Sequence, residues 1–443
     1  MSAVGRPDLE QRKQLLRQLL EQRGAGGAPA AEAGPGAAAR VEKLEDAREV
    51  DAFHARMRHL AGLGLSDPCF HSLEGPAAGT VVIGGRTLAD FSGYNYLGLA
   101  ADPRVKRAAQ DAIEQYGTSA SASRLASGQR QVHAELEQEI ASFLGVEDAL
   151  VLTAGYATNL TILGHVLGPR DLVLHDELAH NSILLGCQLS HARRLPFAHN
   201  DLDALDDLLR RHRGDVEKAL IVVEGAYSMD GDFPDLPRLL AIRRKHGAAV
   251  FVDEAHSLGV MGPTGRGIGE HFAVDRREVD LWMGTLSKTL SSVGGYVAGP
   301  GKLLRYLKYT APGFIFSAGM PPASAAAALA ALRLLQDEPW RVAKLGANCA
   351  LFLEEARAAG LDTALSGSTA VVPVVVHDSV RCLRLAARLF EGGINVFPMT
   401  YPAVAEDQAR LRFFISSEHT MEQLRGAVST VARLLGEPRA TAA

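Results

Sequence analysis

Residues 247–260, GAAVFVDEAHSLGV, form a short apolar run that ends in the polar residues Asp253 and His256. The run predicts a buried strand. An aspartate at the end of such a strand is usually a metal ligand, a catalytic group or the partner of a cationic nitrogen. The letters DEAH are also a helicase box, but that activity requires a phosphate loop of the form GxxxxGKS or GxxxxGKT. The nearest match, Gly301-Lys302, is followed by Leu303, so a helicase is excluded.

Similar apolar runs lie on both sides of this strand and alternate with helical patterns. Strands are predicted at 149–156, 171–177, 218–228 and 279–288. Helices are predicted at 157–167, 202–212 and 235–246, and another begins near His180. The alternation predicts an α/β fold with a mostly parallel sheet covered on both faces. Such sheets bind ligands at the carboxyl ends of their strands, which is where the polar residues fall.

Lys288 follows the last of these strands, in WMGTLSKTLSSVGGYVAG (282–299). A lone lysine is ordinarily a solvated surface charge, but this one lies between an apolar strand and a Gly/Ser-rich turn. A desolvated lysine loses basicity and can form a Schiff base with an aldehyde. Pyridoxal phosphate needs such a lysine, an acidic partner for its pyridinium nitrogen and donors for its phosphate. Lys288 and Asp253 suit the first two roles.

Two more candidate positions follow predicted strands. Gly155 and Tyr156 open a helix, and the N–H groups at a helix N-terminus bind phosphate. His180 alone would be taken for a buried or capping histidine, but its planar ring could stack on a pyridine ring. His175 and His180 lack the HExxH spacing of a zinc site, so no metal site is predicted.

The composition excludes several classes of protein. The 443 residues carry a net charge of -5, which provides no basic surface for nucleic acid or anionic membranes. No run reaches the ~18 apolar residues that span a bilayer, and the N-terminus has no apolar core for a signal peptide. The four cysteines stand singly, and no GxSxG elbow indicates a serine hydrolase. We expect a cytoplasmic protein without a membrane span.

The pattern changes toward both ends of the chain. Leucines at helical spacing in residues 8–23 predict an amphipathic helix, which is either a terminal appendage or a docking helix for a partner such as a carrier protein. A Gly/Ala/Pro-rich linker (24–39) and a second helical stretch (40–61) follow it. Near the other end we predict an alanine-rich helix (320–336), strands (369–377, 394–398, 411–416) and a final helix (420–436). We therefore divide the chain into a helix and linker (1–39), an N-terminal segment (40–100), a large cofactor-binding domain (101–305) and a small C-terminal α+β domain (306–443).

Nine motifs, taken in order, carry a resemblance to a known family. They are FSGYNYLGLAADPRV (91–105), GTSASASRLASGQRQVHAELEQEIA (117–141), TAGYATNL (153–160), DELAHNSI (176–183), EGAYSMDGD (224–232), VDEAHSLGVMGPTGRG (252–267), GTLSKTL (284–290), FSAGMPP (316–322) and LRFFISSEHT (411–420). From about 70 to 440 the sequence resembles the α-oxoamine synthases, which include 8-amino-7-oxononanoate synthase, 5-aminolevulinate synthase, serine palmitoyltransferase and glycine C-acetyltransferase. The resemblance implies a fold-type I, aspartate aminotransferase-like large domain and pyridoxal 5′-phosphate as cofactor.

The resemblance also implies roles for individual residues. Lys288 would hold the cofactor and later move the Cα proton of the substrate. Asp253 would pair with the pyridinium nitrogen, His256 would bond the phenolic oxygen, and His180 would stack on the ring and assist acyl transfer. The remaining residues expected at the cofactor or its phosphate are Gly155, Tyr156, Thr285 and, close by, Ser228.

Two further positions concern the substrate and a second subunit. Arg412 matches the arginine that binds the amino-acid carboxylate. Ser317 matches a position that reaches the phosphate from the neighbouring subunit, which implies an obligate homodimer with shared active sites. The implied reaction is a decarboxylative Claisen-type condensation. The deprotonated amino acid attacks an acyl thioester, and loss of CO2 from the β-keto acid yields an α-aminoketone.

Departures from the family pattern concern the substrate. Tyr94-Asn95 resembles serine palmitoyltransferase, whereas the oxononanoate and aminolevulinate enzymes usually carry Asn-Asp. Ser123 stands where aminolevulinate synthases have a threonine that crowds substrates larger than glycine, so we expect alanine or serine to be accepted. The N-terminal region and residues 59–75 resemble oxoamine synthase modules that release polyketide chains. This likeness favours an acyl-carrier-protein thioester over a CoA thioester.

Several alternatives stay open from the sequence. Biotin-pathway synthesis of 8-amino-7-oxononanoate and sphingoid-base synthesis use the same chemistry. Another fold-type I enzyme, such as an aminotransferase or a threonine-aldolase-like lyase, would share Lys288 and Asp253 but would not need FSAGMPP or SMDGD. A catalytically silent, partner-binding homologue normally lacks the lysine that is present here.

Overall fold

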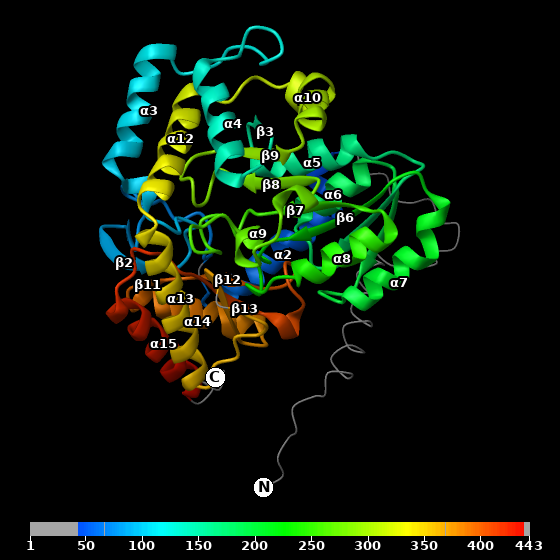
Figure 1. Cartoon of the computed structure of the whole chain (residues 1–443). Coiled ribbons are helices and arrows are strands. Elements are labelled where there is room, and N and C mark those ends of the chain that lie inside the picture. The colour runs from blue at the N-terminus through cyan, green and yellow to red at the C-terminus, as the bar shows by residue number, and fades with distance from the viewer. Residues whose placement is uncertain (1–42, 66, 368, 438–443) are drawn as a thin grey trace.

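A seven-stranded sheet lies at the centre of the structure, a computed structural model that describes residues 43–65, 67–367 and 369–437 (Figure 1). In spatial order its strands are β3 (Asp148–Leu152), β9 (Gly295–Gly299), β8 (Leu281–Thr285), β7 (Ala249–Asp253), β6 (Ala219–Glu224), β4 (Leu172–Asp176) and β5 (Arg193–Phe197). Only β9 runs antiparallel to its neighbours. The predicted mostly parallel sheet is confirmed.

Successive residues of these strands contribute to two separate cores. On β4, Leu172 and Leu174 pack into one cluster, while Val173 between them packs into the other. Side chains alternate between the faces of a strand, so strands covered on both faces are apolar throughout. The first cluster includes residues of α4 (Gln131–Leu144), α7 (Leu202–His212), α8 (Leu236–His246) and α12 (Pro322–Asp337). The second includes residues of α5 (Gly155–Val166), α6 (Asn181–Leu189), α10 (Gly301–Thr310) and α11 (Pro312–Ile315).

The C-terminal part builds a smaller antiparallel sheet of β10 (Val371–Val375), β13 (Arg410–Phe414) and β12 (Phe397–Met399). Three helices accompany it: α13 (Trp340–Ala358), α14 (Ser379–Glu391) and α15 (Met421–Gly436). A third sheet joins distant parts of the chain, because β2 (Arg86–Asp90) pairs with both β1 (Thr80–Ile83) and β11 (Ile394–Asn395). The remaining helices are α2 (Arg48–Gly62), α3 (Pro103–Tyr116) and α9 (Ile268–His271), with 3-10 helices at Leu44–Asp46, Leu99–Ala101, Arg213–Asp215, Arg276–Glu278 and Glu406–Gln408.

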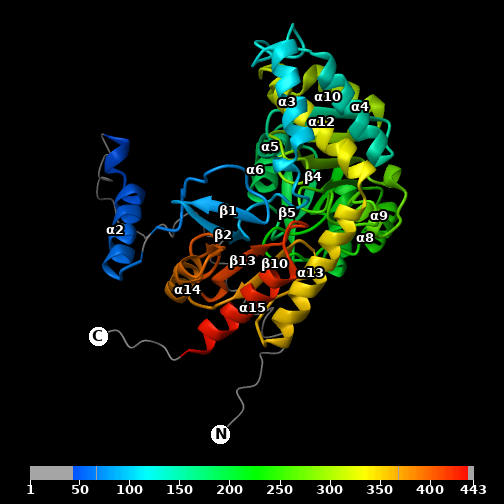
Figure 2. The same ribbon diagram turned by 90° about the vertical axis from the view of Figure 1, so that its left-hand side faces the viewer.

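Helix α2 lies at the outside of the molecule, on the side of β1, β2 and α14 (Figure 2). None of its residues is buried, and Arg56 lies over the ring of Tyr401. The helix predicted at 8–23 falls outside the described residues, and the four-part domain division stays a prediction. In the part of the chain that the structure describes, no helix is long and apolar enough to cross a membrane.

Candidate active site

Four neighbouring strands of the parallel sheet end at one edge in polar residues. These residues are Asp176 of β4, Glu224 of β6, Asp253 of β7 and Thr285 of β8. Glu224 and Asp253 are register partners, so their side chains lie next to each other. Lys288 follows Thr285 by three residues. Asp253, Thr285 and Lys288, three of the predicted residues, therefore lie at the edge where sheets of this type bind ligands.

Lys288, His256 and Tyr96 form a chain of hydrogen bonds. Lys288 Nζ lies 2.9 Å from His256 Nε2, and the Tyr96 hydroxyl lies 2.7 Å from Nδ1 of the same ring. Burial lowers the pKa of His256 well below its ordinary value, and the positive charge of Lys288 acts in the same direction. The imidazole is therefore neutral, with one donor and one acceptor nitrogen. By exchanging tautomers it can accept from a Lys288 ammonium or donate to a neutral amine.

Lys288 is a weak base for a lysine. Burial lowers its pKa from 10.5 to about 8, although the carboxylates of Asp253 and Glu224 partly oppose the shift. Nζ also lies 5.8 Å from the centre of the Tyr94 ring. A lysine with this pKa releases its proton readily near neutral pH, which a nucleophile or a proton-transfer group requires.

Asp253 is buried and held by two donors. Asn159 Nδ2 of α5 donates to Oδ2 at 2.8 Å, and the backbone N–H of Ala255 donates to Oδ1 at 2.9 Å. Asn159 also donates to Ser182 Oγ at 2.9 Å, so one amide connects α5, α6 and β7. Sequence reasoning did not assign a role to Asn159, although the residue stands in the quoted motif TAGYATNL. The sequence feature that could have indicated a role for Asn159 is a polar amide on an otherwise apolar face of a helix.

Glu224 is a second buried carboxyl beside Asp253 that the sequence analysis quoted without a role. Burial raises its pKa well above the ordinary value, and the neighbouring charge of Asp253 raises it further. Glu224 Oε1 accepts the backbone N–H of His180 at 2.6 Å. Because β6 thereby holds the start of α6, the position of His180 depends on Glu224.

His180 is the N-cap residue of α6. Its Nδ1 lies 2.7 Å from Ser182 Oγ and 3.3 Å from Ser182 N, which directs Nε2 away from the helix. Tyr156 meets the ring edge-on with 6.2 Å between ring centres, and its hydroxyl donates to Asn181 Oδ1. As a whole residue, His180 is exposed. A planar group at the carboxyl edge could therefore stack on it.

Gly155 and Thr285 form a shallow backbone cradle at the start of α5. A Cβ on Gly155 would lie 2.5 Å from Thr285 Oγ1, so only glycine leaves this space open. The N-cap residue, Ala154, has no side-chain oxygen to satisfy the first N–H groups of the helix. Ser287 Oγ, at 2.8 Å from Thr285 Oγ1, adds another hydroxyl that the sequence analysis missed. Uncapped N–H groups and hydroxyls beside a glycine suit a phosphate.

Arg412 reaches the same region from β13. Its Nη1 donates to the carbonyl of Ser228 at 3.1 Å and to Met229 Sδ at 3.4 Å, while Nε is buried without a hydrogen-bond partner. The guanidinium lies 4.7 Å from the centre of the Phe414 ring, and Tyr94 packs edge-on against that ring. Tyr94 therefore lies between Arg412 and Lys288. The positive charge of Arg412 also helps to lower the pKa of Lys288, and a guanidinium with an unpartnered Nε near an amine suits the carboxylate of an amino acid.

Asn95, Ser123 and Ser317 do not contact the Lys288 cluster by hydrogen bonds or ring contacts in the described residues. Asn95 Oδ1 accepts from Ser291 Oγ at 3.2 Å, so it supports the turn after Lys288. Ser123 pairs with Ala318 in an isolated β-bridge. Ser123 and Ser317 therefore lie on two segments of backbone that pair with each other.

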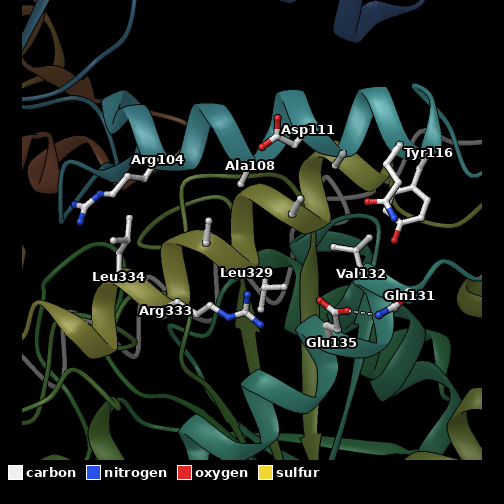
Figure 3. A pocket seen from close by; sticks show the side chains of 14 residues that line it. Arg104, Ala108, Asp111, Tyr116, Gln131, Val132, Glu135, Leu329, Arg333 and Leu334 are labelled. Atoms are coloured by element: carbon white, nitrogen blue, oxygen red, sulfur yellow. Dashed lines mark hydrogen bonds between the residues drawn. The ribbon is translucent and has the colours of Figure 1, made fainter.

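Together, the residues near Lys288 fit pyridoxal phosphate. The structure supplies a lysine of lowered pKa, a buried carboxylate, an exposed histidine and an open glycine cradle. A separate groove of about 480 Å³ lies on the outer surface between α3, α4 and α12 (Figure 3) and contains none of these residues. Within residues 43–65, 67–367 and 369–437, no group of three or more His, Cys, Asp or Glu side chains could hold a metal ion.

Comparisons with known proteins agree with this arrangement. Residues 86–431 match the family model of class I and II aminotransferases. The chain is 39% identical to 8-amino-7-oxononanoate synthase of Symbiobacterium thermophilum, over 84% of this chain and 94% of that protein. It is 42% identical to the enzyme of the same name from Geobacter sulfurreducens, over 82% and 93%. The structure is also similar to serine palmitoyltransferase from S. paucimobilis with bound PLP, with a TM-score of 0.83 and 31% identity over 88% and 98% of the two chains.

Proposed function

The chain belongs to the class I and II aminotransferases and, within them, to the α-oxoamine synthases, and on this premise we propose how its own residues perform the reaction. It is a pyridoxal-phosphate-dependent acyltransferase that condenses an α-amino acid with an acyl thioester and releases CO2. The observation that carries the assignment of residues is the hydrogen-bonded pair of Lys288 and His256 beside Asp253.

We assign the cofactor-holding residues from the geometry of the carboxyl edge. Asp253, which Asn159 holds in place, would pair with the pyridine nitrogen, and His180 would cover one face of the ring. Gly155, Tyr156 and Thr285, at the start of α5 and the end of β8, hold the phosphate. When bound, the cofactor supplies an aldehyde that condenses with amines and a ring that withdraws electrons from the adjacent carbon.

Lys288 is the group that moves the proton of the substrate. Its lowered pKa means that Nζ is available as a base once it is released from the cofactor. His256 holds Nζ from one side, and the Tyr94 ring bounds the other. Arg412 binds the carboxylate through its unused donors, which directs the Cα–H bond rather than the carboxylate toward Lys288.

An absorbance titration with glycine, L-alanine and L-serine tests this function. We expect the wild-type holoenzyme to show an absorbance band of the bound cofactor, and L-alanine or L-serine to perturb the band at lower concentration than glycine. Lys288→Ala should abolish the band of the unliganded enzyme. Absence of a band in wild-type protein supplied with pyridoxal phosphate would exclude the enzyme assignment.

We further propose a homodimer in which Ser317 serves the partner's site. Large side chains shortly before Ser317 in the sequence are exposed: Phe316 is 85% exposed, and Tyr309 and Tyr306 of α10 are 60% and 50% exposed. Exposed aromatic residues in this number are typical of an interface. Mixed dimers of Lys288→Ala and Ser317→Glu chains test the sharing of residues. If Ser317 acts across the interface, each mixed dimer regains one intact site. If it acts within its own chain, both sites stay impaired.

For the acyl donor we propose an acyl-carrier-protein thioester, supported by the resemblance of residues 59–75 and of the N-terminal region. The test compares turnover of carrier-bound and CoA-bound forms of the same acyl group by the full chain and by a chain lacking residues 1–40. We expect the carrier-bound form to be preferred and the deletion to reduce that preference. Equal turnover of both donors by both chains would exclude it.

A further inference from the structure

A buried ionic cluster lies at the carboxyl ends of β4 and β5, and it includes Asp176, to which no role is assigned above. His199 follows β5, and its two ring nitrogens face two carboxylates. Nδ1 lies 2.9 Å from Asp176 Oδ1 at the end of β4, and Nε2 lies 2.8 Å from Asp232 Oδ2 in the loop after β6. The imidazole side chain is 7% exposed. His199 therefore joins two loops that belong to different strands.

The geometry requires a charged imidazole. An ionised carboxylate can only accept hydrogen bonds, so both ring nitrogens must donate. Asp176 already accepts the N–H groups of Leu178 and Asn200, and Asp232 accepts the side-chain amide of Asn200. Although burial alone would lower it, the hydrogen bonds to the two carboxylates raise the pKa of His199 to about 10. The His199 imidazole is therefore positively charged at neutral pH.

One arm of the cluster leads to His180. Asp176 closes the turn at the end of β4, because its side chain accepts Leu178 N at 2.8 Å and its carbonyl accepts Ala179 N at 3.1 Å. The next residue is His180, whose own N–H is held by Glu224. The position of the His180 ring thus depends on the shape of a turn that Asp176 fixes.

The other arm leads to Arg412. The carbonyl of Asp232 accepts Tyr227 N at 2.9 Å, and the carbonyl of Tyr227 accepts Gly231 N at 2.9 Å, which closes the loop between them. Within this loop lie Ser228 and Met229, the two residues that Arg412 contacts. Fixing Asp232 therefore fixes the acceptors that orient the guanidinium.

We propose that His199 is a positioning residue that sets the spacing between His180 and Arg412, and so between the cofactor ring and the substrate carboxylate. This inference rests on the proposed role of Arg412. A displacement of the carboxylate by a fraction of an ångström weakens amino-acid binding, because the donors of a guanidinium are fixed in direction.

The test measures amino-acid affinity apart from stability. In holoenzyme, His199→Gln should raise the Kd for L-alanine and L-serine, followed by cofactor absorbance, about tenfold, and it should lower the thermal midpoint. His246→Gln is the matched control. His246 is the last residue of α8, away from the site, and its Nε2 lies 2.8 Å from Oδ1 of Asp206 on α7. The control should leave the Kd unchanged, whatever it does to the midpoint.

A second variant, Asp232→Asn, tests the same cluster if the His199→Gln chain does not fold. Asp232 Oδ1 is buried without a partner, so Asp232→Asn can place its NH2 group there, keep both hydrogen bonds through its amide oxygen and remove the charge. We expect it to raise the amino-acid Kd at least threefold, because bonds to charged groups are about twice as strong as neutral ones. A Kd within twofold of wild type in every variant that folds would overturn the proposal. A wild-type enzyme without a spectral response would instead count against the proposed function.

Discussion

Asn159 shows how a single amide can determine the chemistry of a carboxylate. Asp253 is buried, and a buried carboxyl group needs hydrogen bonds to replace its lost hydration. Asn159 supplies one of the two donors, and the backbone of Ala255 supplies the other. In the site we propose, the orientation of Asp253 toward the cofactor nitrogen therefore depends on a residue from a different element.

We predict that Asn159→Ala weakens cofactor binding about 10- to 100-fold, because Asp253 loses a donor and turns away from the ring. Equilibrium dialysis with pyridoxal phosphate measures the effect. Asn348→Ala is the matched control, since Asn348 is also a buried amide but donates to the carbonyls of Ser416 and His419. A control that weakened cofactor binding as much as Asn159→Ala would contradict the assignment.

Lys288 leads to a prediction about pH. Its pKa is about 8 in the folded chain and 10.5 in a solvated lysine. Between these values the unfolded chain binds a proton that the folded chain lacks, so stability rises with pH through this window. At pH 7 the buried lysine costs about 3 kcal/mol of unfolding free energy. We therefore expect apo Lys288→Met to be more stable than the wild-type apoprotein at pH 7.

Urea unfolding of both apoproteins from pH 7 to 10.5 measures this cost. The stability advantage of Lys288→Met should shrink as the pH rises, and the difference cancels the titration of all other groups. An advantage that is constant over this range would show that Lys288 has an ordinary pKa in the folded chain.

At the scale of elements, the strands that consist of an apolar run were predicted from the sequence. Strands β5 and β9, which have no such run, were missed. β5 (RRLPF) is largely exposed at the edge of the sheet, and β9 (GYVAG) is rich in glycine. Neither has the apolar run of β4 or β7. His199 and Glu224 were given no predicted role for a related reason. Each contacts a segment that is distant in the sequence, and the spacing of residues along the chain does not reveal such contacts.

The N-terminus of α5 carries a prediction of its own. Gly155→Ala would place a methyl group against Thr285 Oγ1 and Cβ, filling the phosphate cradle. We expect pyridoxal phosphate to bind about 100-fold more weakly, while the affinity for pyridoxal, which has no phosphate, changes little. Gly346→Ala, in α13, meets nothing within 4 Å and should stabilise the chain by up to about 1 kcal/mol. Equal losses of affinity for both compounds would show that Gly155 does not serve the phosphate.

At the scale of the whole molecule, the proposed active site lies where the large sheet meets the small C-terminal sheet. The loop after β6 is contacted by Arg410 and Arg412 of β13 and by Thr369, which donates to Gly231 O at 2.7 Å. The general location was predictable, because it follows from strand order and from the carboxyl edge. The side-chain contacts between the sheets were not, because they join residues about 180 positions apart.

Asp230 and Arg410 provide the test of this junction. Arg410 Nη1 donates to Asp230 Oδ1 at 2.6 Å, and both residues are less than a tenth exposed. Asp230→Asn leaves the arginine buried without a counter-charge, so the unfolding free energy should fall by about 3 kcal/mol. In the double variant Asp230→Asn/Arg410→Met, no unpaired charge remains, and most of that loss should be recovered.

Arg410 and Arg412 lie on the same face of β13. The single variant should therefore also weaken amino-acid binding to the holoenzyme, which urea unfolding and absorbance titration measure separately. A loss of stability with unchanged amino-acid affinity would show that the junction holds the sheets together without positioning Arg412.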